Sequence, residues 1–125
     1  MAKKRATRKE SMGKTGLFLL PSLKMRRKSA RGKSYDEELH DFLVKHFSGY
    51  TVSSGSISGY WKDEDGREHY GEHREYKVAF LKQKKVPLLE EYIAKLAEDI
   101  EEECVFWEKG DEAWLIYRTG MRRRK

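Results

Sequence analysis

The segment 53–81 has the pattern of a long β-hairpin, and it constrains the fold more than any other part of the sequence. Asp65 and Gly66 are typical of a hairpin turn, because glycine readily adopts the left-handed backbone conformation that such turns require. After the turn, Tyr76, Val78 and Phe80 alternate with polar or small residues, as in a strand with one buried face. The chain is therefore expected to contain an antiparallel sheet.

Two amphipathic helices are predicted on either side of this hairpin. Ser34 and Glu37 form a capping-box pattern, which predicts a helix from residue 35 that ends near Gly49. Pro87 suits the first turn of a second helix, which carries an apolar stripe as far as Ile100. Short apolar runs predict further strands at residues 16–20, 104–107 and 113–117, the first of them buried on both faces. The segment 22–33 is expected to be a long basic loop of a kind that is often functional or disordered.

This order of elements predicts an α+β fold of the ferredoxin-like type. Its antiparallel sheet would carry two helices on one face and an extra strand at the C-terminal end. The predicted domain organisation is a flexible basic tail at 1–15, a single domain at 16–117 that includes the basic loop 22–33, and a basic tail at 118–125.

Charge is distributed unevenly along the 125 residues. The first 34 residues hold 12 Lys and Arg and one acidic residue, and the last eight hold five Lys and Arg and no acidic residue. Residues 35–117 hold 10 Lys and Arg against 20 Asp and Glu. An acidic domain between basic ends indicates a polyanionic partner, although such tails can also solubilise the chain or fold back onto it.

The preferred functional prediction is a small, non-catalytic protein that binds nucleic acid or a nucleoprotein. Its basic residues would contact the phosphate backbone of DNA or RNA, with weak sequence specificity because phosphate contacts do not read bases. The predicted nucleic-acid-binding residues are Lys3, Lys4, Arg5, Arg8, Lys9, Lys24, Arg26, Arg27, Lys28, Arg31, Lys33, Arg122, Arg123, Arg124 and Lys125.

Two alternatives remain open at this point. In the first, the protein is structural and forms a homo-oligomer, with the basic tails of one copy docked on the acidic segment 98–103 of the next. In the second, it is a small nuclease-like enzyme that uses a candidate polar site of Glu72, His73 and Arg74. A four-residue turn would place Glu72 opposite Ile57 in this hairpin.

The sequence predicts no cofactor, no metal site and no catalytic residue beyond that polar site. On a strand, His69 and His73 would lie about 13 Å apart, too far to bind one ion by themselves. Cys104 is the single cysteine, so no intrachain disulfide is expected and an intracellular, cytoplasmic location is predicted. No apolar run is long enough to suggest a membrane partner.

A set of hairpin residues also carries a family resemblance. A Gly-rich strand ends in an aromatic pair, a Gly turn follows, and the return strand contains Glu; the residues are Gly55, Gly59, Tyr60, Trp61, Gly66, Glu72 and Tyr76. In these features the chain resembles short bacterial and phage proteins of uncharacterised function. The resemblance covers residues 35–107 and excludes the basic extensions. It implies the ferredoxin-like plan and no particular chemistry.

Overall fold

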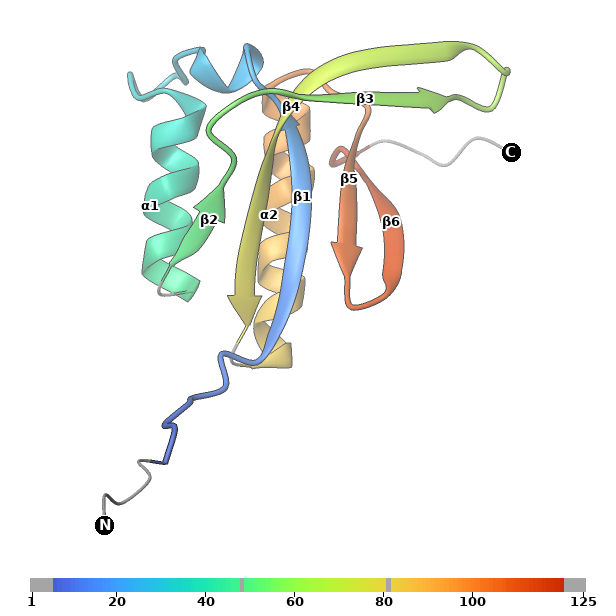
Figure 1. Ribbon diagram of the computed structural model, residues 1–125. Helices are drawn as coiled ribbons and strands as arrows, with labels where there is room; N and C mark the ends of the chain where they lie inside the picture. Colours follow the sequence, from blue (N-terminus) through green and yellow to red (C-terminus); the bar gives the residue numbers. More distant parts are fainter. Residues whose placement is uncertain (1–5, 48, 81, 121–125) are drawn as a thin grey trace.

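The computed structural model describes residues 6–47, 49–80 and 82–120, and it contains a six-stranded sheet and two α-helices (Figure 1). The elements are β1 (Lys14–Pro21), η1 (Lys24–Arg26), α1 (Tyr35–Phe47), β2 (Tyr50–Val52), β3 (Ile57–Lys62), β4 (Glu68–Phe80), η2 (Gln83–Lys85), α2 (Val86–Asp99), β5 (Cys104–Lys109) and β6 (Glu112–Tyr117). The strand order is β2-β4-β1-β5-β6, with β3 also paired to β4, and all pairs are antiparallel.

The helix starts predicted from the sequence are confirmed. The Ser34 hydroxyl accepts a hydrogen bond from the Glu37 backbone N–H at 3.1 Å, as an N-cap residue should. Pro87 lies in the first turn of α2, where its missing N–H costs nothing. The two helices then pack against each other through a stacked pair of rings, Phe42 and Tyr92, whose centroids are 3.9 Å apart.

Alternate residues of the three central strands form the core against these helices. Phe18 of β1 lies opposite Tyr76 of β4 and Trp107 of β5, so the three side chains share one face. The Phe18 and Tyr76 rings are stacked with centroids 5.3 Å apart. The buried indole N–H of Trp107 donates to Glu90 of α2 at 2.9 Å, which satisfies the polar atom inside the core.

The opposite face of the sheet is less covered than predicted. The prediction that 16–20 would be buried on both faces is wrong, because Leu17 and Leu19 are only half-buried while Phe18 and Leu20 are buried. The helix-covered face therefore holds the core. The loop 22–33 also differs from its prediction, since Met25 is fully buried and anchors it.

The hairpin is confirmed, but its outgoing strand is broken into β2 and β3. The Ser53 hydroxyl accepts from the Glu75 backbone N–H at 3.0 Å, which takes one ladder hydrogen bond away from the main chain. Residues 53–56 bulge out here, and β3 pairs with Glu72 opposite Ser58 rather than Ile57 as predicted. Gly66 sits in the turn with φ 81°. Figure 1 shows β3 and the first part of β4 extending from the body as an arm.

The α+β class, the antiparallel sheet and the two helices are thus as predicted, although the sheet has six strands. Within the described residues, neither helix is long and apolar enough to cross a membrane.

Candidate functional site

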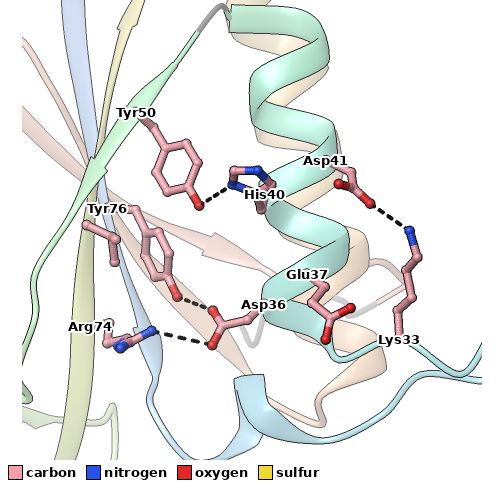
Figure 2. A pocket seen from close by; sticks show the side chains of 9 residues that line it. Lys33, Asp36, Glu37, His40, Asp41, Tyr50, Arg74 and Tyr76 are labelled. Carbon is pink, nitrogen blue, oxygen red and sulfur yellow. Dashed lines mark hydrogen bonds and ion pairs between the residues drawn. The ribbon is translucent and has the colours of Figure 1, made fainter.

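An open hollow of about 300 Å³ lies between α1, β2 and the second half of β4 (Figure 2). Its size is at the lower end of the range for small-molecule pockets. Its walls combine charged groups with two tyrosine rings, and the lining residues are Lys33, Asp36, Glu37, His40, Asp41, Tyr50, Val52, Arg74 and Tyr76.

The helix wall is built by residues one turn apart. Asp36 and His40 are four residues apart, as are Glu37 and Asp41, so the four side chains lie on neighbouring rows of one helix face. The N-cap at Ser34 fixes where the helix begins, and this fixes the position of all four. The first two turns of α1 thus place three carboxylates at the hollow.

Asp36 links the helix wall to the sheet wall. Its Oδ1 atom accepts a hydrogen bond from the Tyr76 hydroxyl at 2.6 Å, and its Oδ2 atom lies 3.5 Å from Arg74 Nη1. Burial, followed by the Asp36 carboxylate, raises the pKa of Tyr76 well above its usual value. The Tyr76 hydroxyl therefore stays protonated and keeps Asp36 in place.

A second contact between the walls joins His40 and Tyr50. The Tyr50 hydroxyl lies 3.0 Å from His40 Nδ1, and the two rings meet edge to face with centroids 5.7 Å apart. Burial, with a smaller effect from Asp36, raises the pKa of Tyr50. A protonated Tyr50 donates this hydrogen bond when the His40 tautomer leaves Nδ1 free to accept.

The outer rim of the hollow carries Lys33, Asp41 and Glu37. Lys33 Nζ donates to Asp41 at 3.0 Å, and this hydrogen bond raises the pKa of Lys33. The Glu37 side chain is exposed, and among the residues that the structure describes its carboxylate accepts no hydrogen bond. Glu37 is thus the carboxylate of the hollow with the most freedom to meet a ligand.

The predicted polar site is not brought together. Successive residues of a strand point to opposite faces, so His73 lies on the other side of β4 from Glu72 and Arg74. Glu72 lies in the arm, 3.4 Å from the Tyr70 hydroxyl, whereas Arg74 enters the hollow. The His73 ring lies against Gly71, where an added Cβ would come within 2.5 Å of it.

Several residues of the predicted nucleic-acid set are paired within the chain. Arg31 binds both oxygens of Glu38, and the Arg31 guanidinium lowers the pKa of that carboxyl. Lys24 lies 3.0 Å from Glu102, and Arg8 donates to Glu10 at 2.6 Å. Lys9, Arg26, Arg27 and Lys28 are exposed. The others of the set apart from Lys33, namely Lys3, Lys4, Arg5, Arg122, Arg123, Arg124 and Lys125, lie outside the described residues.

Metal ligands do not gather at the histidines. Across the described parts of the chain, no three His, Cys, Asp or Glu side chains lie close enough together to hold a metal ion. His69 is engaged instead with Asp63, whose Oδ2 atom lies 2.9 Å from His69 Nε2 at the tip of the arm.

By architecture the protein is a small α+β domain with a helix-backed antiparallel sheet and a hollow beside its first helix. Two solved structures share this fold, both of a phage S-adenosylmethionine (SAM) lyase. The complex with S-methyl-5'-thioadenosine has a TM-score of 0.57 and 12% identity over 95% of this chain and 100% of that chain. The apo state has a TM-score of 0.56 and 11% identity over 94% and 100%. No family model and no curated protein sequence matches the chain.

These comparisons contradict the prediction of a non-catalytic nucleic-acid-binding protein, since the structures that share the fold are those of an enzyme. The physical reason for the error lies in the charge count, which treated basic and acidic segments as separate. In the fold, Arg31 and Lys33 of the basic loop are neutralised by Glu38 and Asp41 of α1. The DNA or RNA partner, the homo-oligomer and the cytoplasmic location stay predictions.

Most residues of the hollow were not predicted as site residues from the sequence. The acidic residues Asp36 and Glu37 at the start of α1 were not interpreted as site residues, and Glu37 was assigned to the capping box. Their spacing of four from His40 and Asp41 was the available signal, because it places polar side chains on one helix face. Nothing in the sequence indicated that β2 and β4 would bring Tyr50 and Tyr76 to the same place.

Proposed function

We propose that the protein is a small-molecule enzyme of the lyase type that binds SAM, or a closely related sulfonium nucleoside, in the hollow between α1, β2 and β4. One observation carries the proposal: a fold similar along nearly the whole chain to a SAM lyase contains a hollow with three carboxylates and two tyrosine rings. Carboxylates and aromatic faces are the groups that attract a cation such as a sulfonium.

The chemistry of such a lyase sets the requirements on the site. The bond between the sulfonium sulfur and the methionyl carbon breaks, and its electron pair stays on sulfur to give S-methyl-5'-thioadenosine. As this bond breaks, the carboxylate of the four-carbon fragment attacks the same carbon and closes a lactone, or a basic group takes a proton from the adjacent carbon and an alkene forms. Either route balances without water, and the positive charge on sulfur disappears as the bond breaks.

Glu37 would supply the counter-charge for this cation. Because the sulfonium charge fades toward the transition state, Glu37 would attract the bound substrate more strongly than the transition state. Its removal should therefore weaken substrate binding without slowing the chemical step. Tyr50 and Tyr76 would contribute their rings and their protonated hydroxyls to the opposite wall.

The test is to incubate the purified protein with SAM and to separate the products by liquid chromatography. We expect S-methyl-5'-thioadenosine to accumulate with time and enzyme concentration. Glu37→Gln should raise KM by about tenfold with a smaller change in kcat. Glu64→Gln, the same substitution at an exposed position of the arm tip, serves as the matched control and should change neither constant.

A folded protein that neither binds SAM in calorimetry nor releases S-methyl-5'-thioadenosine would show that the proposal is wrong. If Glu37→Gln and Glu64→Gln changed KM and kcat equally, the hollow would not be the SAM-binding site.

The strand order also supports the ferredoxin-like plan as the finer description of the fold. The units β1–α1–β2 and β4–α2–β5 each connect strands that have one other strand between them, as two interleaved split βαβ units do. We infer that β3 and β6 are additions to this plan.

A further inference from the structure

We propose that Arg74 is the carboxylate-binding residue of the hollow, so that its ligand carries a free carboxylate next to a cationic centre, as the methionyl end of SAM does. The inference rests on the proposed function for the place where the substrate binds. It adds the chemical group that the site selects and the residue that selects it.

The contacts of Arg74 leave most of its hydrogen-bonding capacity available. A guanidinium has five N–H donors, and the contact between Arg74 and Asp36 joins one nitrogen to one oxygen at 3.5 Å. The stronger contact of Asp36 goes to the Tyr76 hydroxyl at 2.6 Å, through its other oxygen. Asp36 thus positions Arg74 without occupying the paired donors that a carboxylate prefers.

Arg74 is also the better placed of the two cations of the hollow. Its side chain is 31% exposed, whereas the Lys33 side chain is 58% exposed and its Nζ atom already donates to Asp41 at 3.0 Å. A charge with less water around it attracts a ligand more strongly. Arginine also binds a carboxylate through two parallel hydrogen bonds, which lysine cannot do.

The two walls of the hollow therefore differ in charge in a way that fits a zwitterion. Arg74 comes from the sheet wall on β4, and Glu37 comes from the helix wall on α1 (Figure 2). A ligand with a carboxylate at one end and a cation nearby can satisfy both groups at once. A ligand without the carboxylate offers Arg74 no partner beyond the neighbours it has in the described structure, among them Asp36 at 3.5 Å.

The decisive measurement compares the binding of SAM with that of decarboxylated SAM by calorimetry. The two ligands share the nucleoside, the sulfonium and the amine, and they differ in the carboxylate. The wild-type protein should bind SAM about 10-fold to 100-fold more tightly, as expected for a charge-assisted bidentate contact. Arg74→Gln should bind both ligands about equally, and Arg74→Lys should keep part of the preference. Arg67→Gln, at an exposed position of the arm, should leave the preference unchanged.

The outcomes separate the two proposals. If the wild-type protein binds neither ligand, the proposed function fails. If it binds both equally, or if Arg74→Gln keeps the full preference for SAM, the proposed function stands and the role of Arg74 is overturned. If Arg74→Gln does not fold, the role of Arg74 can still be tested. The ratio of the affinities for SAM and decarboxylated SAM is then compared between the wild-type protein and Arg74→Lys. The ratio of two affinities is a readout that a merely structural role of Arg74 would not change.

Discussion

The two halves of β4 have the same alternating pattern but different surroundings. Tyr70 and Tyr76 lie six residues apart on one strand, and therefore on the same face of it. Tyr76 is 2% exposed, stacks on Phe18 and bonds to Asp36, whereas Tyr70 is 55% exposed and meets the Tyr60 ring in the arm. The strand alone does not bury a tyrosine; the helix that covers its second half does.

This difference also determines which half can hold a site. In the second half, α1 faces β4 across the hollow and supplies the Asp36 carboxylate, which pairs with Tyr76 and Arg74 of the sheet. In the first half, β3 is the partner strand, and the side chains pair mainly with one another, as Trp61 does with His69. A ligand that needs groups from two directions can find them only in the second half.

The largest expected effect tests the contrast directly with a matched pair of substitutions. Tyr76→Ala should lower the free energy of unfolding by about 3–5 kcal/mol, because it removes a buried ring and leaves a cavity. Tyr70→Ala should cost about 0.5–1 kcal/mol, since the ring is exposed and loses one aromatic neighbour. Urea denaturation of both variants, with the slope m compared with wild type, measures the two values.

Similar losses for the two variants would contradict the contrast, because they would mean that the arm is as tightly packed as the body.

A smaller effect on stability is expected where a substitution adds a methyl group to a glycine. A Cβ at Gly16 would lie 2.5 Å from the Trp107 ring and 2.6 Å from the Phe80 ring, both buried in the core. Gly16→Ala should therefore destabilise the protein by about 1–3 kcal/mol. A Cβ at Gly71 would lie 2.5 Å from the His73 ring, which is half-buried and can rotate away. Gly71→Ala should cost less than about 1 kcal/mol.

Thermal unfolding of the two variants measures whether Gly16→Ala destabilises the protein more than Gly71→Ala does. A larger loss for Gly71→Ala would show that the His73 ring is held as firmly in the arm as Trp107 is in the core.

Local signals in the sequence predicted most of the elements but not their surroundings. The cap at Ser34, Pro87 in α2 and the turn at Gly66 each depend on a few adjacent residues, so the sequence reveals them. The break at residues 53–56 depends on the Ser53 side chain replacing a main-chain partner of Glu75 across the sheet. Such a long-range contact leaves no periodic pattern in the sequence.

The hollow was unpredictable for the same reason. The polar side chains of α1 could be placed on one helix face from their spacing. The partners of Asp36, which are Arg74 and Tyr76, and the partner of His40, which is Tyr50, reach them only through tertiary packing. Counting charges segment by segment gave the wrong functional prediction. Arg31 was counted in a basic segment and Glu38 in an acidic one, but in the fold the two side chains form an ion pair.

The smallest expected effect concerns pH at the tip of the arm. Asp63 accepts hydrogen bonds from His69 and from the backbone N–H groups of Arg67 and Asp65, and these hold the pKa of its carboxyl below the ordinary value of 3.8. The native state thus favours the ionised carboxylate, so its contribution is fully present above about pH 4. It is lost as the pH falls through the lowered pKa.

Carbon-13 NMR of the Asp63 carboxyl and amide shifts at Gly66 measure this step. The arm tip should loosen on acidification while the amides around Tyr76 keep their shifts and their protection from exchange. Asp63→Asn keeps an oxygen that can accept from the backbone but does not titrate, so this step should be missing from its profile. An Asp63 pKa at or above 3.8 would contradict the effect of these hydrogen bonds on the carboxyl. One transition shared by tip and core would mean that the two halves of β4 respond to acid as a single unit.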